Sequence, residues 1–238
     1  MTDAVLEFAG ISKNYQGLRP LRIAELRIAA GERVAILGFD RFSAEIFVNL
    51  ATGATLPDAG EVRVFGRPTS AIADSADWLA TVDRFGIVSE RAVLLDQLTV
   101  IQNLAMPFTL DIEPPAAGVQ ARAEGLAREA GLPEASWAKR VADLDANGLV
   151  RVRLGRAIAL DPAVLWLEHV TASVGRDDVA ALASDMRKIA RRRGAAIVAA
   201  TADEVFARAV AGRVLTLEPS SGRLKERRRL RWFGTGLG

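Results

Sequence analysis

The sequence of 238 residues contains no cysteine, a single histidine and a single tyrosine. The lack of cysteine excludes disulfide bonds, thiol catalysis and cysteine-ligated metals. Because His169 is the only histidine, a metal site built from imidazole ligands is not expected, and we predict no metal centre. No run of about 18 uncharged apolar residues occurs, so no membrane-spanning helix is expected. The dipeptide Gly-Lys is also missing from the whole chain.

Half of the residues are apolar and the formal net charge is only +2, so the chain can bury a large core. Its first residues have no basic segment followed by an apolar one, from which we expect a protein that is not secreted. Basic residues gather near the end of the sequence: Arg223, Lys225, Arg227, Arg228, Arg229 and Arg231. Such a run usually forms a solvated tail, and contact with anionic lipid or an acidic partner is the alternative.

Segments of strand type and helix type alternate along most of the chain. Short alternating runs at residues 5–8, 21–23 and 26–28 predict a small antiparallel sheet. Continuous apolar runs predict buried strands of a mostly parallel sheet at residues 34–37, 85–88, 163–167, 195–200 and 214–217. Helical spacing occurs between these runs at residues 150–160, 177–193 and 205–211. This alternation predicts an α/β fold.

Residues 90–140 are mostly helical in pattern, with interruptions at Pro107 and at residues 113–118. We interpret this region as a helical lobe inserted into the α/β core. The expected organisation is one domain over residues 1–238, divided into a core of residues 1–88 and 150–220, a helical lobe of residues 89–149, and a basic C-terminal tail of residues 221–238.

Residues 34–50 have the frame of a phosphate-binding loop. The apolar strand at residues 34–37 ends at Gly38, and helical spacing begins at about Ser43. A strand, a tight turn and a helix form the frame of the P-loop motif G-x-x-x-x-G-K-[ST]. Gly38 fits its first glycine, but Ser43, Ala44 and Glu45 stand at its second glycine, its lysine and its hydroxyl. The frame is present without the groups that bind phosphate.

The chain resembles the nucleotide-binding (ATP-binding cassette) subunit of ABC transporters over essentially its whole length. Residues 52–66 look like the family's loop and strand after the Walker A helix, and LTVIQNLAMP at residues 98–107 resembles a helix of the family's helical lobe. LGRAIALDP at residues 154–162 is similar to the helix after the signature motif, and VLWLE at residues 164–168 falls at Walker B. The resemblance implies a P-loop NTPase (RecA-like) core with a mostly parallel sheet, an N-terminal antiparallel β part and an inserted helical lobe.

The resemblance also assigns family positions to single residues. Tyr15 falls where an aromatic residue stacks on adenine, and this feature is retained. Most other positions have changed: Ala44 and Glu45 at the Walker A lysine and hydroxyl, Glu90 at the Q-loop glutamine, Asp145, Ala146, Asn147 and Gly148 in the signature, Glu168 and His169 at the Walker B aspartate and the catalytic glutamate, Gly175 at the D-loop aspartate, and Ala202 at the switch histidine.

These changes bear directly on phosphate binding. In a P-loop, backbone N–H groups and a lysine neutralise the phosphates, and a hydroxyl ligates Mg²⁺. Here Glu45 would face the γ-phosphate, and like charges within about 4 Å cost several kcal/mol in a partly buried site. Arg41 adds bulk and can supply positive charge, but not from the position of the lysine. We therefore predict no confident cofactor, with weak ATP/Mg²⁺ binding as the alternative.

The acids near this turn have a second use. A carboxylate at a helix N-terminus contributes roughly 0.3–1 kcal/mol, so Asp40 and Glu45 can take the electrostatic role that phosphate has in a working relative. We therefore expect the fold to be stable without nucleotide. Glu168 is a weak candidate ligand for Mg²⁺. His169 is a candidate general base, and local packing at the end of a strand is the more ordinary interpretation.

The resemblance implies a cytoplasmic protein, peripheral at the inner face of the cell membrane, that partners a membrane permease and a second nucleotide-binding subunit, as a homodimer or heterodimer. Residues 90–107 match the region that receives the permease in the family, and their pattern favours lipid and lipoprotein transport. We therefore expect a structural or regulatory subunit without ATP hydrolysis.

Two alternatives remain open. One is an active or weakly active ATPase subunit that completes a heteromeric transporter. The other is a binding module outside transport whose basic tail contacts a membrane; nucleic acid is not expected as a partner, because the tail adds only Trp232 and Phe233 to its charges.

Overall fold

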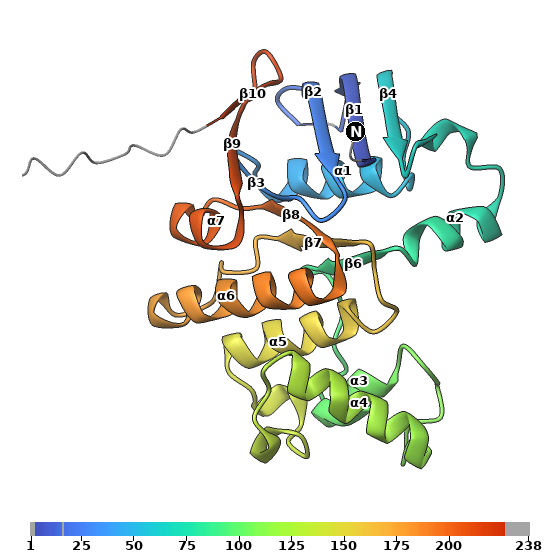
Figure 1. Ribbon diagram of the computed structural model, residues 1–238, viewed down its shortest axis with the longest axis vertical. Helices are drawn as coiled ribbons and strands as arrows, with labels where there is room; N and C mark the ends of the chain where they lie inside the picture. The colour runs from blue at the N-terminus through green and yellow to red at the C-terminus, as the bar shows by residue number, and fades with distance from the viewer. Residues whose placement is uncertain (1–2, 16, 227–238) are drawn as a thin grey trace, which may run out of the picture.

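In the computed structural model, which describes residues 3–15 and 17–226, the strands form two sheets. A four-stranded sheet has the order β2-β1-β4-β5, and a six-stranded sheet has the order β10-β9-β3-β8-β7-β6. Figure 1 places the four-stranded sheet at one end of the molecule and the helices α3 and α4 at the other end. The α/β architecture predicted from the sequence is confirmed.

The four-stranded sheet contains β1 (Ala4–Lys13), β2 (Leu21–Ala29), β4 (Ala59–Val64) and the short β5 (Arg67–Pro68), all paired antiparallel. It is the antiparallel sheet expected near the N-terminus. The two short runs predicted at residues 21–23 and 26–28 form one continuous strand, β2, in which Ala24 and Glu25 are both exposed and interrupt the alternation of buried side chains.

The six-stranded sheet is parallel except for β10. Its strands are β3 (Arg33–Leu37), β6 (Phe85–Val88), β7 (Val164–Glu168), β8 (Ala196–Ala200), β9 (Arg213–Glu218) and β10 (Arg223–Glu226). All but β10 coincide with predicted runs. The central strands β7 and β8 are buried at every position, so they are apolar instead of alternating, apart from Glu168 at the end of β7.

Residues 223–226 of the expected basic tail form strand β10. The N–H groups of Ser221 and Gly222 donate to the carbonyl of Glu218, and Gly222 has a φ of 72°. This tight turn reverses the chain and lets β10 pair antiparallel with β9. Residues 227–238, with the remaining arginines of the run, lie outside the described residues.

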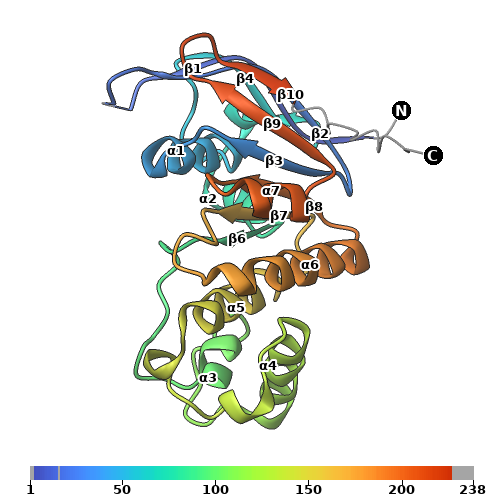
Figure 2. The ribbon, with the colours of Figure 1, turned by 90° about the vertical axis from the view of Figure 1, so that its left-hand side faces the viewer.

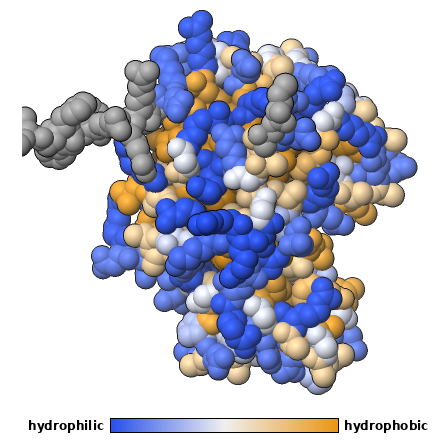
Figure 3. Space-filling model, viewed as in Figure 1, coloured by the Kyte–Doolittle hydropathy of each residue, from blue (hydrophilic) through white to orange (hydrophobic). Residues whose placement is uncertain are grey.

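Helices cover both faces of the six-stranded sheet. The helix α1 (Arg41–Ala51) lies between the two sheets, as Figure 2 shows, and its side chains share a core with Val34, Ile36 and Trp166. The opposite face packs against α6 (Arg176–Arg193) and α7 (Glu204–Val210) in a second core. The outer side of α6 is hydrophilic in Figure 3, and α2 (Ser75–Val82) projects to one side in Figure 1.

The region predicted as a helical lobe contains less helix than expected. It holds α3 (Val100–Ala105), α4 (Ala117–Glu129) and the 3₁₀ turns η2 (Glu134–Ser136) and η3 (Val141–Asp143), joined by long loops; another such turn, η1 (Thr69–Ala71), lies before α2. Prolines at 107, 114 and 115 prevent one long helix. The helix α5 (Ala146–Ala157) begins four residues before the predicted 150. Among the described residues, no helix is long and apolar enough to cross a membrane.

Candidate functional site

The turn between β3 and α1 is shorter than the sequence suggested. Gly38 has a φ of 100°, and a Cβ atom there would lie 2.9 Å from the carbonyl oxygen of Leu217. The buried Phe39 stacks on Phe47 of α1, with ring centroids 4.8 Å apart. Helix α1 begins at Arg41, two residues before the predicted Ser43. The residues that wrap phosphate in a P-loop are therefore the first turn of a helix here.

A carboxylate of the chain itself occupies the N-terminus of α1. Asp40 Oδ1 accepts hydrogen bonds from the N–H of Ser43 at 2.7 Å and from its hydroxyl at 2.6 Å, and the Asp40 N–H donates to Ser43 Oγ at 2.9 Å. These bonds from Ser43 lower the pKa of the Asp40 carboxyl, and the nearby His169 contributes less. Asp40 thus takes the electrostatic position expected for it, with Ser43 as its partner.

Arg91 joins the two acids that stand at the Walker A hydroxyl and the Walker B aspartate. Its Nε and Nη2 donate to the two carboxylate oxygens of Glu168 at 3.1 and 2.7 Å. Its Nη1 lies 3.2 Å from Oε1 of Glu45. The Glu168 side chain is 6% exposed, and its hydrogen bonds raise the pKa of Arg91. Glu45 is thus part of an ion-pair cluster and does not cap α1.

Sequence reasoning missed Arg91. The signal was a charge imbalance: two acids, one of them at the end of a buried strand, lacked a cation. Buried carboxylates are almost always paired, so a basic side chain is expected nearby. Arg91 follows Glu90 directly, 77 residues before Glu168, and no family motif includes it.

Glu90, at the Q-loop position, is held from two sides. Arg41 Nη2 donates to its Oε2 at 3.1 Å, and the Ser173 hydroxyl donates to its Oε1 at 2.9 Å. Ser173 lies in the loop after β7. The structure therefore brings together Arg41, Glu45, Glu90 and Glu168 of the predicted site, with Arg91 between the acids.

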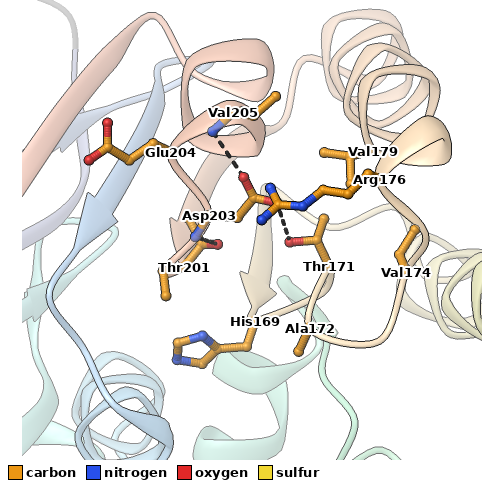
Figure 4. A pocket seen from close by; sticks show the side chains of 11 residues that line it. His169, Thr171, Ala172, Val174, Arg176, Val179, Thr201, Asp203, Glu204 and Val205 are labelled. Atoms are coloured by element: carbon orange, nitrogen blue, oxygen red, sulfur yellow. Dashed lines mark hydrogen bonds between the residues drawn. The ribbon is translucent and has the colours of Figure 1, made fainter.

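His169 follows Glu168 in a left-handed conformation, with a φ of 46°. Its Nε2 is buried and has no hydrogen-bond partner among the described residues. With Ala202 and Asp203 it lines a cavity of about 500 Å³, in which the Thr171 hydroxyl donates to Oδ2 of Asp203 at 3.2 Å (Figure 4). No side chain reaches across this cavity from Ala202, where the family has its switch histidine.

The remaining predicted residues lie at two places. Tyr15 is half-buried near the turn: burial raises its pKa, and the charge of Asp40 adds to the effect. The signature residues lie at the start of α5, where Asp145 accepts a hydrogen bond from the N–H of Gly148 at 2.7 Å. Asp145, Asn147 and Gly148 line a separate cavity of about 490 Å³.

The arrangement does not fit MgATP in the usual P-loop mode. Mg²⁺ takes oxygen ligands, and both carboxylates nearest its expected place are already paired with Arg91. Asp40 fills the position at the helix N-terminus where phosphate would bind. Within residues 3–15 and 17–226, no group of three or more histidine, aspartate and glutamate side chains is arranged to hold a metal ion.

No protein-family model matches the chain. Several curated proteins do. The lipoprotein-releasing system ATP-binding protein LolD of Maricaulis maris is 32% identical over 205 residues, which cover 84% of this chain and 89% of that protein. LolD of Chromohalobacter salexigens is 27% identical over 94% of each chain. The methionine import ATP-binding protein MetN of Caulobacter vibrioides is 31% identical over 93% of this chain and 66% of its own length.

Solved structures show the same fold. CbiO1 from Clostridium perfringens, part of the ABC transporter complex cbiONQ, has a TM-score of 0.78 at 20% identity and covers 94% of this chain and 87% of its own. The dimeric bacterial ABC transporter cassette MJ0796 has a TM-score of 0.76 at 21% identity and covers 94% and 99%. The resemblance seen in the sequence is confirmed. The chain belongs to the family of ABC transporter ATP-binding subunits.

Proposed function

We propose that this chain has lost ATP hydrolysis and acts as a structural or regulatory subunit of an ABC transporter. One observation carries the proposal: the guanidinium of Arg91 lies between Glu45 and Glu168, the residues at the Walker A hydroxyl and Walker B aspartate positions. A cation supplied by the chain thus stands where a working relative needs a divalent ion.

Binding of MgATP would have to disrupt this arrangement. Glu168 is buried, so Mg²⁺ could reach it only by displacing Arg91, and the displaced guanidinium would lose its bidentate hydrogen bonds. Asp40 would have to leave the helix N-terminus, and Glu45 would face the γ-phosphate. Ala44 offers no positive charge in return. Each of these costs opposes nucleotide binding.

For the partners, we propose a membrane permease and a second nucleotide-binding subunit, with the chain peripheral at the cytoplasmic face of the membrane. Two relatives are named as parts of lipoprotein-releasing systems, which favours a lipid or lipoprotein permease. A groove of about 590 Å³ between residues 95–98 and 110–113 suits the permease contact. Leu95, Leu98 and Leu110 line it beside Asp96 and Asp111, so a short amphipathic helix with basic flanks fits best.

A second candidate function is a weakly active ATPase in a heteromeric transporter. The retained Tyr15 favours it, and so do the names of the relatives, which are ATP-binding proteins. It differs from the first proposal in one measurable respect, the release of phosphate from ATP.

The deciding experiment is calorimetric titration of the purified chain with MgATP, together with a phosphate-release assay. LolD of Maricaulis maris, treated identically, is the positive control. We expect no binding heat at millimolar nucleotide and no phosphate release. Binding heat that Tyr15→Ala removes, together with phosphate release that the same substitution reduces, would overturn the proposal and establish the second candidate.

A further inference from the structure

Residues 89–95, which we call the connecting segment, lead from the end of β6 toward α3. On the side of the nucleotide-site frame, Arg91 binds Glu168 and Glu45, and Glu90 binds Arg41. The segment is thereby tied to α1 and β7, the two elements that carry the Walker A and Walker B positions. Ion pairs between side chains of this chain therefore join the connecting segment to the Walker A and Walker B positions.

The opposite side of the connecting segment is tied to the helices. From α5, Arg156 Nη1 donates to the carbonyl of Val93 at 2.7 Å and Arg153 Nε to that of Ala92 at 3.3 Å. The fully buried Asn103 of α3 accepts from the Leu95 N–H at 2.9 Å and donates to the Leu95 carbonyl at 3.0 Å. Side chains from four elements therefore fix a segment of seven residues.

We infer that these contacts hold the connecting segment in one position without nucleotide, so that the surface around it is presented constitutively to the permease helix proposed above. Val93, in the connecting segment, is 73% exposed, and Leu110, which lines the adjacent groove, is 88% exposed. The identity of the partner rests on the proposed function. The fixed position rests only on the contacts of the described residues.

Arg91 is the positioning residue for the connecting segment. Of the three ion pairs named above, only Arg91–Glu168 involves a buried carboxylate. The Arg41–Glu90 pair belongs to the same segment, but the arginine is 73% exposed and the glutamate 37% exposed. Exposed pairs of this kind contribute little to stability. Substitutions of Arg41 and Arg91 therefore form a matched pair: each removes one guanidinium from the same network, but only one guanidinium is bidentate to a buried acid.

The test is hydrogen–deuterium exchange of the full chain, followed in peptides covering residues 89–98. Amide protons in this region are hydrogen-bonded at Arg91, Ala92, Leu95 and Leu98. We expect exchange to be at least about 10-fold faster in Arg91→Gln and within about 2-fold of the wild type in Arg41→Gln. Millimolar MgATP should leave wild-type exchange unchanged. Peptides from β1 and β2 report global stability in every sample.

A second variant separates loss of the contact from the cost of an unpaired acid. The double variant Arg91→Met/Glu168→Leu removes both charges and keeps apolar volume, so it should fold. We expect the same faster exchange in residues 89–98 with wild-type exchange in β1 and β2. Wild-type exchange of the connecting segment in this double variant would overturn the inference.

Nucleotide provides the other decisive outcome. A change in exchange of residues 89–98 on adding MgATP to the wild type would overturn the inference, because the segment would then respond to nucleotide. Phosphate release measured on the same samples tests the proposed function separately. Hydrolysis without a change in exchange would refute the loss of ATPase activity and leave the fixed segment standing.

Discussion

Arg91 and Glu168 form an asymmetric pair, and this asymmetry leads to a prediction at the scale of single residues. The Glu168 side chain is 6% exposed, whereas that of Arg91 is 41% exposed. Arg91→Gln strands a buried carboxylate and should lower the free energy of unfolding by about 2–3 kcal/mol. Glu168→Gln leaves an arginine that can reach water and Glu45, so it should cost about 1 kcal/mol. Urea unfolding of both variants measures the two losses of unfolding free energy, and equal losses would contradict the prediction.

Sequence reasoning identified the changed positions of the site but not how they interact. The frame of residues 34–50 predicted a strand, a turn and a helix, which β3 and α1 form, and Glu168 lies at the end of the predicted strand β7. The ion pairs depend on rotamers and on the path of a loop far away in the sequence. Arg91 lies 77 residues from Glu168 along the chain, and no local pattern connects two such positions.

At the scale of elements, strands were easier to predict than helix starts. Buried parallel strands are apolar runs, which stand out in a sequence. Helices α1 and α5 begin earlier than predicted because Asp40 and Asp145 cap them, and the first turns after these caps contain few apolar residues. Strand β10 was missed because charged residues dominate it, and only the turn at Gly222 places it beside β9.

The cap of α1 gives a prediction at the same scale. Asp40→Ala removes the acceptor of both bonds from Ser43 and should lower the free energy of unfolding by about 1 kcal/mol at neutral pH. Hydrogen bonds from Ser43 lower the pKa of Asp40, so the carboxylate stabilises the fold above its unfolded pKa and loses this effect as pH falls through the lower folded value. The difference in the free energy of unfolding between Asp40→Ala and the wild type should therefore disappear in acid.

Chemical denaturation at pH 7 and at about pH 3 measures that difference. Asp145→Ala is the matched control at α5, because Asp145 also caps a helix but accepts a bond from the N–H of Gly148 and has no partner like the Ser43 hydroxyl among the bonds described. Asp145→Ala should lower the free energy of unfolding by less than Asp40→Ala does. A larger effect at α5 would show that the Ser43 hydroxyl adds nothing to the cap of α1.

At the scale of the whole molecule, ion pairs connect α4 of the helical region to α6 of the core. Glu129 at the end of α4 accepts from Arg193 Nε at 2.8 Å and from its Nη2 at 2.7 Å, and Arg192 Nη2 adds a bond at 2.6 Å. Arg193 also donates to Asp161 at 2.7 Å. The side chains of Glu129 and Arg193 are 17% and 18% exposed, so solvent screens this pair only partly. These contacts join segments 64 residues apart.

The ion pairs between α4 and α6 should weaken in acid, because the carboxylate of Glu129 becomes protonated. Hydrogen bonds from Arg193, with further contributions from Arg192, lower the pKa of the Glu129 carboxyl. Glu129 therefore adds stability above its unfolded pKa and loses it as pH falls through the lower folded value. Glu129→Gln should therefore lower the free energy of unfolding by about 1–2 kcal/mol at pH 7 and by much less near pH 3.

Glu134→Gln is the control, because it removes an exposed partner of Arg128 at 3.8 Å and should change the free energy of unfolding by at most about 0.5 kcal/mol. Urea unfolding of the three proteins across this pH range provides the measurement, and a Glu129→Gln deficit that stays constant with pH would exclude Glu129 as the titrating group.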